Sequence, residues 1–194
     1  MTEDDLTGLL PPAGPRRARL IEHMAELERQ GIHCFSCSGV CCTALANSMM
    51  TTPLETLELA HYLKSEGRID ETLRTRLHHC IRRYRLDREP PGDGRRGFLR
   101  RTYTCPFLEP GPRGCSLSRS IKPYGCLGFN PHRANQTEGG DCAANGELLT
   151  GREDQYATTE EPVNRRIRAE LELDWEKKPM PTALLEVIDR LDWW

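Results

Sequence analysis

Apolar side chains recur at intervals of three and four residues in several stretches of the chain, and such stretches predict amphipathic helices. The first expected helix runs from Pro15 to Gln30, with Gly31 as its C-terminal cap. Its apolar face comprises Leu20, Ile21, Met24 and Leu27. The preceding segment, 1–14, contains Pro11, Pro12 and Gly14, so a flexible N-terminal tail is expected there.

Two more helices are predicted from clear start signals. Thr52 is placed as an N-cap, Pro53 occupies the first helical position and Glu55 completes a capping box. This helix should end near Gly67. Asp70 is the expected N-cap of the next helix, which should run to about residue 88. Its apolar positions are Leu73, Leu77, Ile81 and Tyr84.

Beyond the breaker Pro90-Pro91-Gly92-Asp93-Gly94 the helical pattern stops. Residues 97–150 are rich in Gly, Pro and Asn, which predicts loop with one short strand near 98–104. Two further helices are expected near 161–173 and 181–192, in a helical C-terminal extension over 147–194. The pattern therefore predicts a mainly α fold, with residues 15–194 forming a single loop-rich domain.

Composition indicates a polar protein with a small core. Of 194 residues, 37% are hydrophobic and 29% are charged, and the mean hydropathy is −0.63. No apolar run approaches the length of a membrane span, so no membrane partner is expected. The acidic start, Met1–Asp5, is not followed by the apolar region of an export signal, which favours a cytoplasmic location. The net charge of −2 indicates no partner by itself, and no pattern gives an oligomeric state.

Eight of the nine cysteines fall into two blocks. The first has the spacing C-x2-C-x3-C-C, and the second follows after more than sixty residues. The eight are Cys34, Cys37, Cys41, Cys42, Cys105, Cys115, Cys126 and, trailing the second block, Cys142. Two residues between thiolates let both reach one metal from a tight turn. Disulfides are the alternative, but an odd cysteine count and no export signal argue against them. The cysteine pattern therefore predicts a polycysteine metal centre.

Thiolates alone suit zinc and iron–sulfur clusters alike. Eight would satisfy two tetrahedral zinc ions, or one four-iron cluster with thiols to spare. Binding of either to the folded chain alone would also stabilise a domain with so small a core.

The order of the motifs resembles a known family. C-x2-C-x3-C-C, then Cys105-Pro-Phe-Leu, then Gly114-Cys-Ser-Leu, then Lys122-Pro-x-x-Cys is similar to the YkgJ-type cysteine-cluster family, described as a zinc- or iron-chelating domain. The match covers about residues 34–142, and Lys122-Pro123 stands where the family usually has Arg-Pro. The resemblance implies metal ligation by the eight clustered cysteines and favours an iron–sulfur cluster, 4Fe–4S, over zinc.

Larger relatives that carry this cluster are associated with lysine methylation of flagellin through an iron–sulfur centre. The resemblance therefore implies a redox or group-transfer role on a protein substrate. The sequence contains no nucleophile elbow, P-loop or dinucleotide fingerprint, so any chemistry would come from the cluster. Whether the protein is an enzyme stays open. The alternatives are a non-enzymatic, zinc-stabilised binding module and a metal-buffering protein.

Two residues outside the metal-binding motifs, Cys80 and His33, are interpreted individually. Cys80 lies outside both blocks, among apolar positions of the third expected helix, and is interpreted as a buried thiol. His33 directly precedes Cys34, where it could ligate a metal or hydrogen-bond to a cluster sulfur.

Arginine is concentrated in one region. Residues 68–101 carry eleven Arg against five acidic residues, whereas 147–194 carry twelve acidic against seven basic ones. A basic face could bind nucleic acid or an acidic protein, and it is the surface that the zinc-stabilised module would use. The alternative is a solvated face paired internally with the acidic C-terminal helices. Since few aromatic residues interleave with the Arg run, nucleic acid is not the expected partner.

Overall fold

The computed structural model describes residues 8, 10–33, 39–88, 101–109, 114–131 and 142–194. The prediction of a mainly helical protein is confirmed. The helices are α2 (Ala13–Arg29), α3 (Pro53–Ser65), α4 (Glu71–Tyr84), α5 (Tyr124–Leu127), α6 (Gly146–Glu170) and α7 (Met180–Arg190), with a 3-10 turn η1 (Val40–Cys42). Two short antiparallel pairs accompany them: β1 (Met50–Thr51) with β4 (Lys178–Pro179), and β2 (Phe129–Pro131) with β3 (Cys142–Ala144).

The expected starts of α3 and α4 are confirmed, and both are capped by the side chains that the sequence indicated. The Thr52 hydroxyl accepts a hydrogen bond from the Glu55 backbone N–H, and the Glu55 carboxylate accepts one from the Thr52 N–H. The Asp70 side chain accepts from the Leu73 N–H at 2.7 Å. These caps satisfy donors that a helix start leaves unpaired. Gly31 follows α2 in the left-handed region, as expected.

Three boundary predictions are wrong. The third helix ends at Tyr84 rather than near residue 88, because Arg85 adopts a left-handed conformation. Residues 101–104, the described part of the expected strand, form no strand. The helix expected over 161–173 begins at Gly146, where the Asn145 side chain caps it, and it continues through Pro162. Segment 97–150 thus also contains α5, β2, β3 and the start of α6, since capping and tertiary packing outweigh its local helix breakers.

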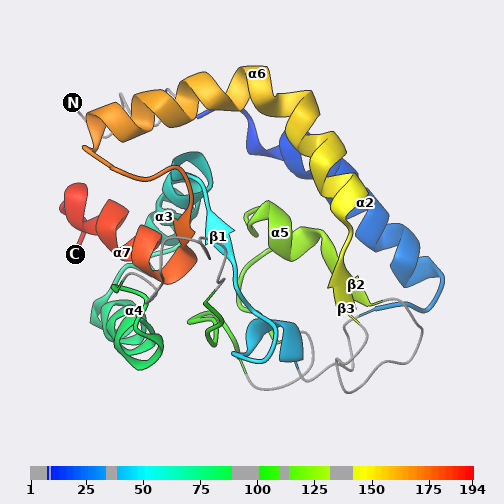
Figure 1. Cartoon of the computed structure of the whole chain (residues 1–194), viewed down its shortest axis with the longest axis horizontal. Helices are drawn as coiled ribbons and strands as arrows, with labels where there is room; N and C mark the ends of the chain where they lie inside the picture. The colour runs from blue at the N-terminus through cyan, green and yellow to red at the C-terminus, as the bar shows by residue number, and fades with distance from the viewer. Residues whose placement is uncertain (1–7, 9, 34–38, 89–100, 110–113, 132–141) are drawn as a thin grey trace, which may run out of the picture.

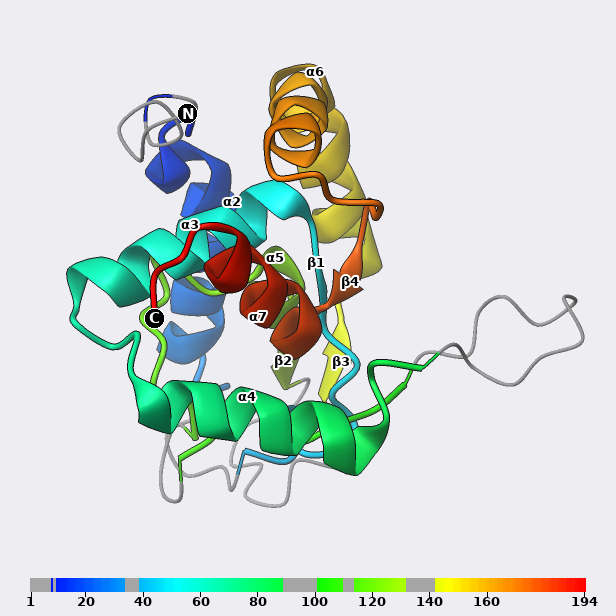
Figure 2. The same ribbon diagram turned by 90° about the vertical axis from the view of Figure 1, so that its left-hand side faces the viewer.

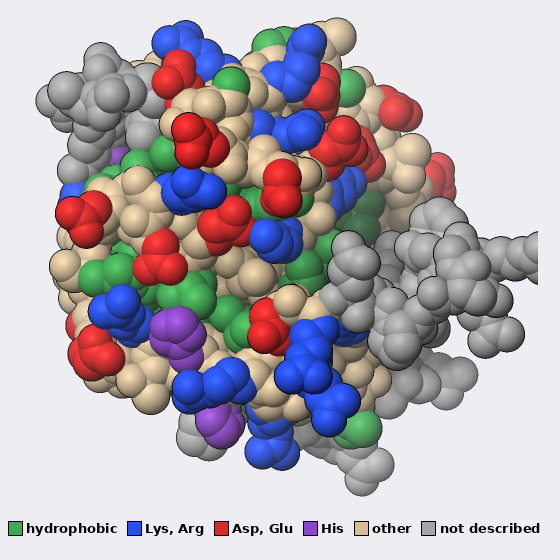
Figure 3. Space-filling view, turned by 60° about the vertical axis from the view of Figure 1, so that its left-hand side comes forward, with side chains coloured by type: hydrophobic (Ala, Val, Ile, Leu, Met, Phe, Trp, Pro, Cys, Tyr) green, Lys and Arg blue, Asp and Glu red, His purple; other side chains and the backbone are tan. Residues whose placement is uncertain are grey.

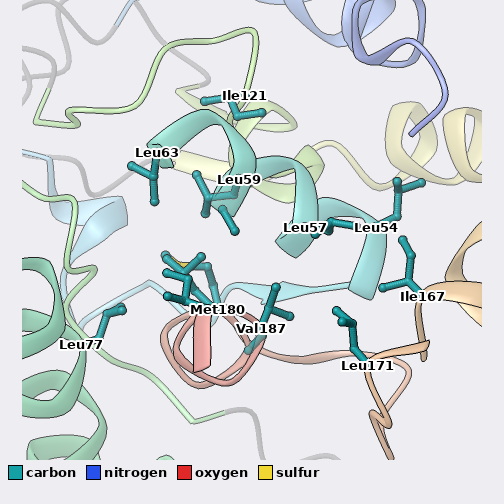
Figure 4. Close-up of a cluster of buried hydrophobic side chains, with 14 of the residues drawn as sticks. Leu54, Leu57, Leu59, Leu63, Leu77, Ile121, Ile167, Leu171, Met180 and Val187 are labelled. Atoms are coloured by element: carbon teal, nitrogen blue, oxygen red, sulfur yellow. The ribbon is translucent and has the colours of Figure 1, made fainter. Parts of the chain in front are cut away.

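The main hydrophobic core lies between α3, α7, α4 and α6 (Figure 4). Leu57, Leu59 and Val187 are fully buried there, and Trp175 is also buried. Met180 begins α7 and follows directly on the β1–β4 pair, so that pairing fixes how α7 enters the core.

A second interior region is ionic. α2 and α6 run side by side along one edge of the molecule (Figure 1), and a network of buried side chains joins them to α3 and α5. The carboxylate of Glu58 on α3 accepts from Arg16 and, at 2.8 Å, from Arg17 on α2. Glu160 on α6 accepts from Arg16, from Arg152 and from the Tyr124 hydroxyl on α5. Each of these buried guanidinium groups is thus paired with a carboxylate. Such pairing is needed because a charge that is buried without a partner is energetically costly.

η1 and the described cysteine-bearing segments 101–109 and 114–118 lie below the ionic network in Figure 1. They occupy the lower middle of that view, between the α4–α7 group and the β2–β3 pair. Figure 2 shows α4 along the end of the molecule opposite α6. Among the described helices, none is both long enough and apolar enough to cross a bilayer.

Candidate metal centre

Backbone hydrogen bonds bring the two cysteine blocks together. The Cys105 N–H donates to the Cys42 carbonyl at 2.7 Å, which joins residues more than sixty positions apart. η1 holds Cys41 and Cys42 in a tight turn, closed by a 2.8 Å bond from the Cys42 N–H to the Gly39 carbonyl. The described part of the first block, Cys41 and Cys42, is therefore attached to the second block through the main chain.

The second block doubles back on itself. Leu108 and Cys115 form an antiparallel bridge, and the Ser116 N–H donates to the Phe107 carbonyl at 3.0 Å. Gly114, beside Cys115, has a φ of 49° and packs on Gly39, whose φ is 77°. A Cβ on Gly114 would lie 3.0 Å from the Gly39 Cα, so glycine is required for this close approach.

Three thiols share protons at this junction. The Cys41 and Cys42 Sγ atoms lie 4.0 Å apart, and Cys42 also hydrogen-bonds to Cys115. The hydrogen bond with Cys42 lowers the pKa of Cys41 to about 7 and that of Cys115 to about 6. The same bonds, first with Cys115 and then with Cys41, raise the pKa of Cys42. Cys42 therefore holds its proton more firmly than Cys41 and Cys115 do.

The remaining described thiols of the junction are less exposed to water. Burial raises the pKa of Cys105 to about 12 and raises that of Cys126 well above its ordinary value. The charges of Cys105 and Cys115 also act on Cys126. A cation among these sulfurs would therefore replace protons that burial holds in place.

Lys122 is a site residue that the cysteine pattern did not reveal. The positive charge of its ammonium group lowers the pKa of Cys115 and Cys41 and acts on Cys126 as well. Its carbonyl accepts a 3.1 Å bond from Arg17 Nε, so the ionic network fixes this part of the chain. In the sequence, the Lys122-Pro123 dipeptide before Cys126 is the signal that could have indicated it. The cation offsets the negative charge of neighbouring thiolates.

Tyr103 connects the cysteine junction to neighbouring segments through hydrogen bonds. The Tyr103 hydroxyl donates to the Met49 carbonyl at 2.6 Å, and the Asn47 side chain donates to the Tyr103 carbonyl at 2.9 Å. Met49 in turn packs on Gly125, where a Cβ would lie 2.7 Å from Met49 Cε. These contacts connect the chain after the first block to the turn that carries Cys126.

The thiols face a large cavity of about 1820 Å³. Its wall includes sulfur-bearing side chains from both blocks and from the β2–β3 region, namely Cys41, Cys42, Cys105, Cys115, Cys126, Cys142, Met49 and Met50. Another part of the wall is charged, with Glu55, Arg152 and Glu160 from the ionic network. The cavity exceeds the ~300–1,000 Å³ of common small-molecule pockets.

The predicted ligands divide into two groups. Cys41, Cys42, Cys105, Cys115 and Cys126 interact with one another, and Cys142 lines the same cavity. Cys34 and Cys37 lie outside the described residues. Within the described part of the chain, no three His, Cys, Asp or Glu side chains are placed so that they could hold one metal ion.

Cys80 is buried beside Ile81, Leu86 and Tyr103, and it donates to the Thr104 carbonyl at 3.3 Å. Its interpretation as a buried thiol is confirmed. Burial raises the pKa of Cys80 to about 12. The thiol nevertheless lies close enough to influence Cys105 electrostatically, which its sequence position did not indicate. His33 is half-buried at the end of the segment that leads to Cys34.

Comparison with protein-family models gave no match, and neither did comparison with curated proteins or with solved structures. The resemblance to the YkgJ-type family therefore rests on the cysteine motifs and their order.

Proposed function

We propose that this protein holds an iron–sulfur cluster through thiolates of its two cysteine blocks, with a redox or group-transfer role on a protein substrate. The observation that carries the proposal is the meeting of five cysteines, from Cys41 to Cys126, at one cavity. A junction built only for packing would not need so many thiols, which are reactive when they are close together.

The donor set fits a soft metal. Thiolate is the form of cysteine that ligates, and Cys41 and Cys115 already favour it. A metal ion replaces the protons that the junction sulfurs share, and each Fe–S or Zn–S bond offsets the cost of removing Cys105 and Cys126 from water. Cys34 and Cys37, only a few residues before η1, are close enough in the chain to complete the set.

Lys122 and the cavity favour the cluster over a purely structural zinc ion. A positive charge beside a ligand sulfur is one means of setting a reduction potential. A structural zinc ion has all four coordination positions filled by protein side chains and needs no cavity, whereas these thiols line a cavity of about 1820 Å³. The cavity has room for a cluster and for a substrate side chain.

Differential alkylation tests which thiols hold metal. In protein purified without oxygen, cysteines of both blocks should react slowly with iodoacetamide and become reactive after chelation of the metal. Cys80 should stay protected in both states, because it is only 4% exposed whether metal is bound or not. Mass spectrometry of the labelled peptides gives each rate, including those of Cys34 and Cys37. Equal rates at Cys105 and Cys115 before and after chelation would contradict the proposal.

A further inference from the structure

The solvent-exposed face of α4 is basic along its length. Arg76, His79, Arg82 and Arg83 are exposed, and they lie opposite the buried Leu73, Leu77 and Ile81. We call these four residues the α4 basic stripe. They span about 10 Å of the helix, since each residue rises ~1.5 Å. Arg85 and Arg88, also exposed, continue the positive charge beyond the end of the helix.

Within the described residues, no ion pair neutralises the α4 basic stripe. Six acidic side chains of the C-terminal region pair with cations of that same region: Glu153 with Lys177, Glu161 with Arg165, Glu170 with Arg166, Glu172 with Arg190, Glu176 with Arg168 and Glu186 with Lys178. The expectation that the acidic C-terminal helices pair with the arginine-rich region is therefore wrong for these residues. α4 meets α7 through its apolar face, which leaves the cations in solvent.

The positive charge is visible on the surface. Lys and Arg side chains gather, together with histidine, in the lower part of Figure 3, at the height of α4. Red side chains are more frequent higher in the same view, where they alternate with blue ones. The molecule as a whole has a net charge of −2, so this basic region is a local feature.

Two tryptophans lie near the start of α4. The guanidinium of Arg74, on α4 but outside the stripe, lies 5.2 Å from the Trp194 ring centroid, and the Lys64 ammonium on α3 lies 4.1 Å from that of Trp193. Both rings are half-buried against the core. Arginine and tryptophan together are typical of the energetic centres of protein–protein interfaces. A long nucleic acid would also experience the repulsion of a net negative molecule, whereas a short acidic segment interacts with its local surface.

We propose that the α4 basic stripe, with the adjacent Trp193 and Trp194, docks an acidic segment of a partner protein. The arginine forks can hold carboxylates in paired hydrogen bonds, and the tryptophan rings provide apolar contact beside them. This surface is separate from the metal centre. The inference therefore does not depend on the proposed function, and each can be tested without the other.

The test is binding of a fluorescein-labelled polyglutamate peptide to the full chain, followed by fluorescence anisotropy. Binding should be measurable at low salt and should weaken near ~0.15 M salt, where exposed charges are screened. The double variant R82Q/R83Q should bind on the order of tenfold more weakly, since two exposed charge contacts are lost.

The matched control is R165Q/R166Q, which removes two adjacent exposed arginines of α6 and changes the net charge equally. It should bind the peptide as the unmodified protein does. Equal weakening in both double variants would show that only net charge matters and would overturn the proposal, as would the absence of binding at low salt. A duplex DNA of equal formal charge serves as competitor. If it binds more tightly than the peptide and requires Arg82 and Arg83, the partner is nucleic acid and the proposal is wrong.

Discussion

Replacing Cys105 by serine should remove most of the bound metal from the protein. A serine hydroxyl remains protonated at neutral pH and is a poor ligand for a soft metal. Because the Cys105 N–H is bonded to the Cys42 carbonyl, the backbone cannot move another donor into its place without breaking the junction. The melting temperature should fall as well, since metal binding is coupled to folding. Metal per chain and the melting temperature, both measured on protein purified without oxygen, check the prediction.

Cys80→Ser is the matched control, because it makes the same chemical change at a neighbouring buried thiol. Serine can keep the hydrogen bond to the Thr104 carbonyl, but it places a hydroxyl beside Ile81 and Leu86. The metal content should be unchanged, and the loss of stability should be ~1–3 kcal/mol. A Cys80→Ser protein without metal, together with a Cys105→Ser protein that retains it, would contradict the assignment of the second block.

Replacing Glu58 by glutamine should destabilise the fold by ~3–5 kcal/mol. Glu58 is 4% exposed and accepts hydrogen bonds from Arg16 and Arg17. Its loss leaves the buried Arg17 guanidinium without its salt-bridge partner and leaves Arg16 with Glu160 alone. Since small domains are stable by only ~5–15 kcal/mol, this is a large fraction of the total. Urea unfolding followed by circular dichroism measures the change.

Glu161→Gln provides the comparison on α6. Its carboxylate side chain is 64% exposed and pairs with Arg165 at 3.7 Å, so its replacement should change stability by less than ~0.5 kcal/mol. Equal urea midpoints for Glu58→Gln and Glu161→Gln would show that the buried network does not stabilise the fold.

Local chemistry made several elements predictable. Thr52, Pro53 and Glu55 form a capping box within four residues, and Asp70 caps a helix with a regular apolar face, so α3 and α4 could be placed from sequence alone. α6 was less predictable, because Gly151 and Pro162 are helix breakers in isolation. Its length depends on contacts with α2 and α3, which are distant in sequence.

The ionic network lies beyond what a sequence pattern can indicate. Arg16 and Arg17 precede the apolar face of α2 and look like solvated residues, yet they are buried because Glu58 and Glu160 meet them from other helices. The same limit applies to Lys122, whose position depends on the bond from Arg17 to its carbonyl. Sequence patterns report local spacing, whereas these partners are brought together only by the tertiary fold.

The cysteine pattern gave more information about the site. Spacing predicted that two distant blocks would converge, and the structure brings Cys41 and Cys42 to Cys105, Cys115 and Cys126. The pattern could not reveal the glycine contact between Gly39 and Gly114 that permits this approach. It also gave no reason to place Cys80 near the junction, since that contact depends on how α4 packs beside Tyr103.

The most direct measurement is the iron and acid-labile sulfide content of protein purified without oxygen, with its visible absorption spectrum. The account predicts brown protein with broad thiolate-to-iron charge-transfer absorption and about four irons and four sulfides per chain. Colourless protein with stoichiometric zinc would contradict the iron–sulfur cluster and favour the zinc-stabilised binding module. Colourless protein that binds neither iron nor zinc would contradict the metal centre itself.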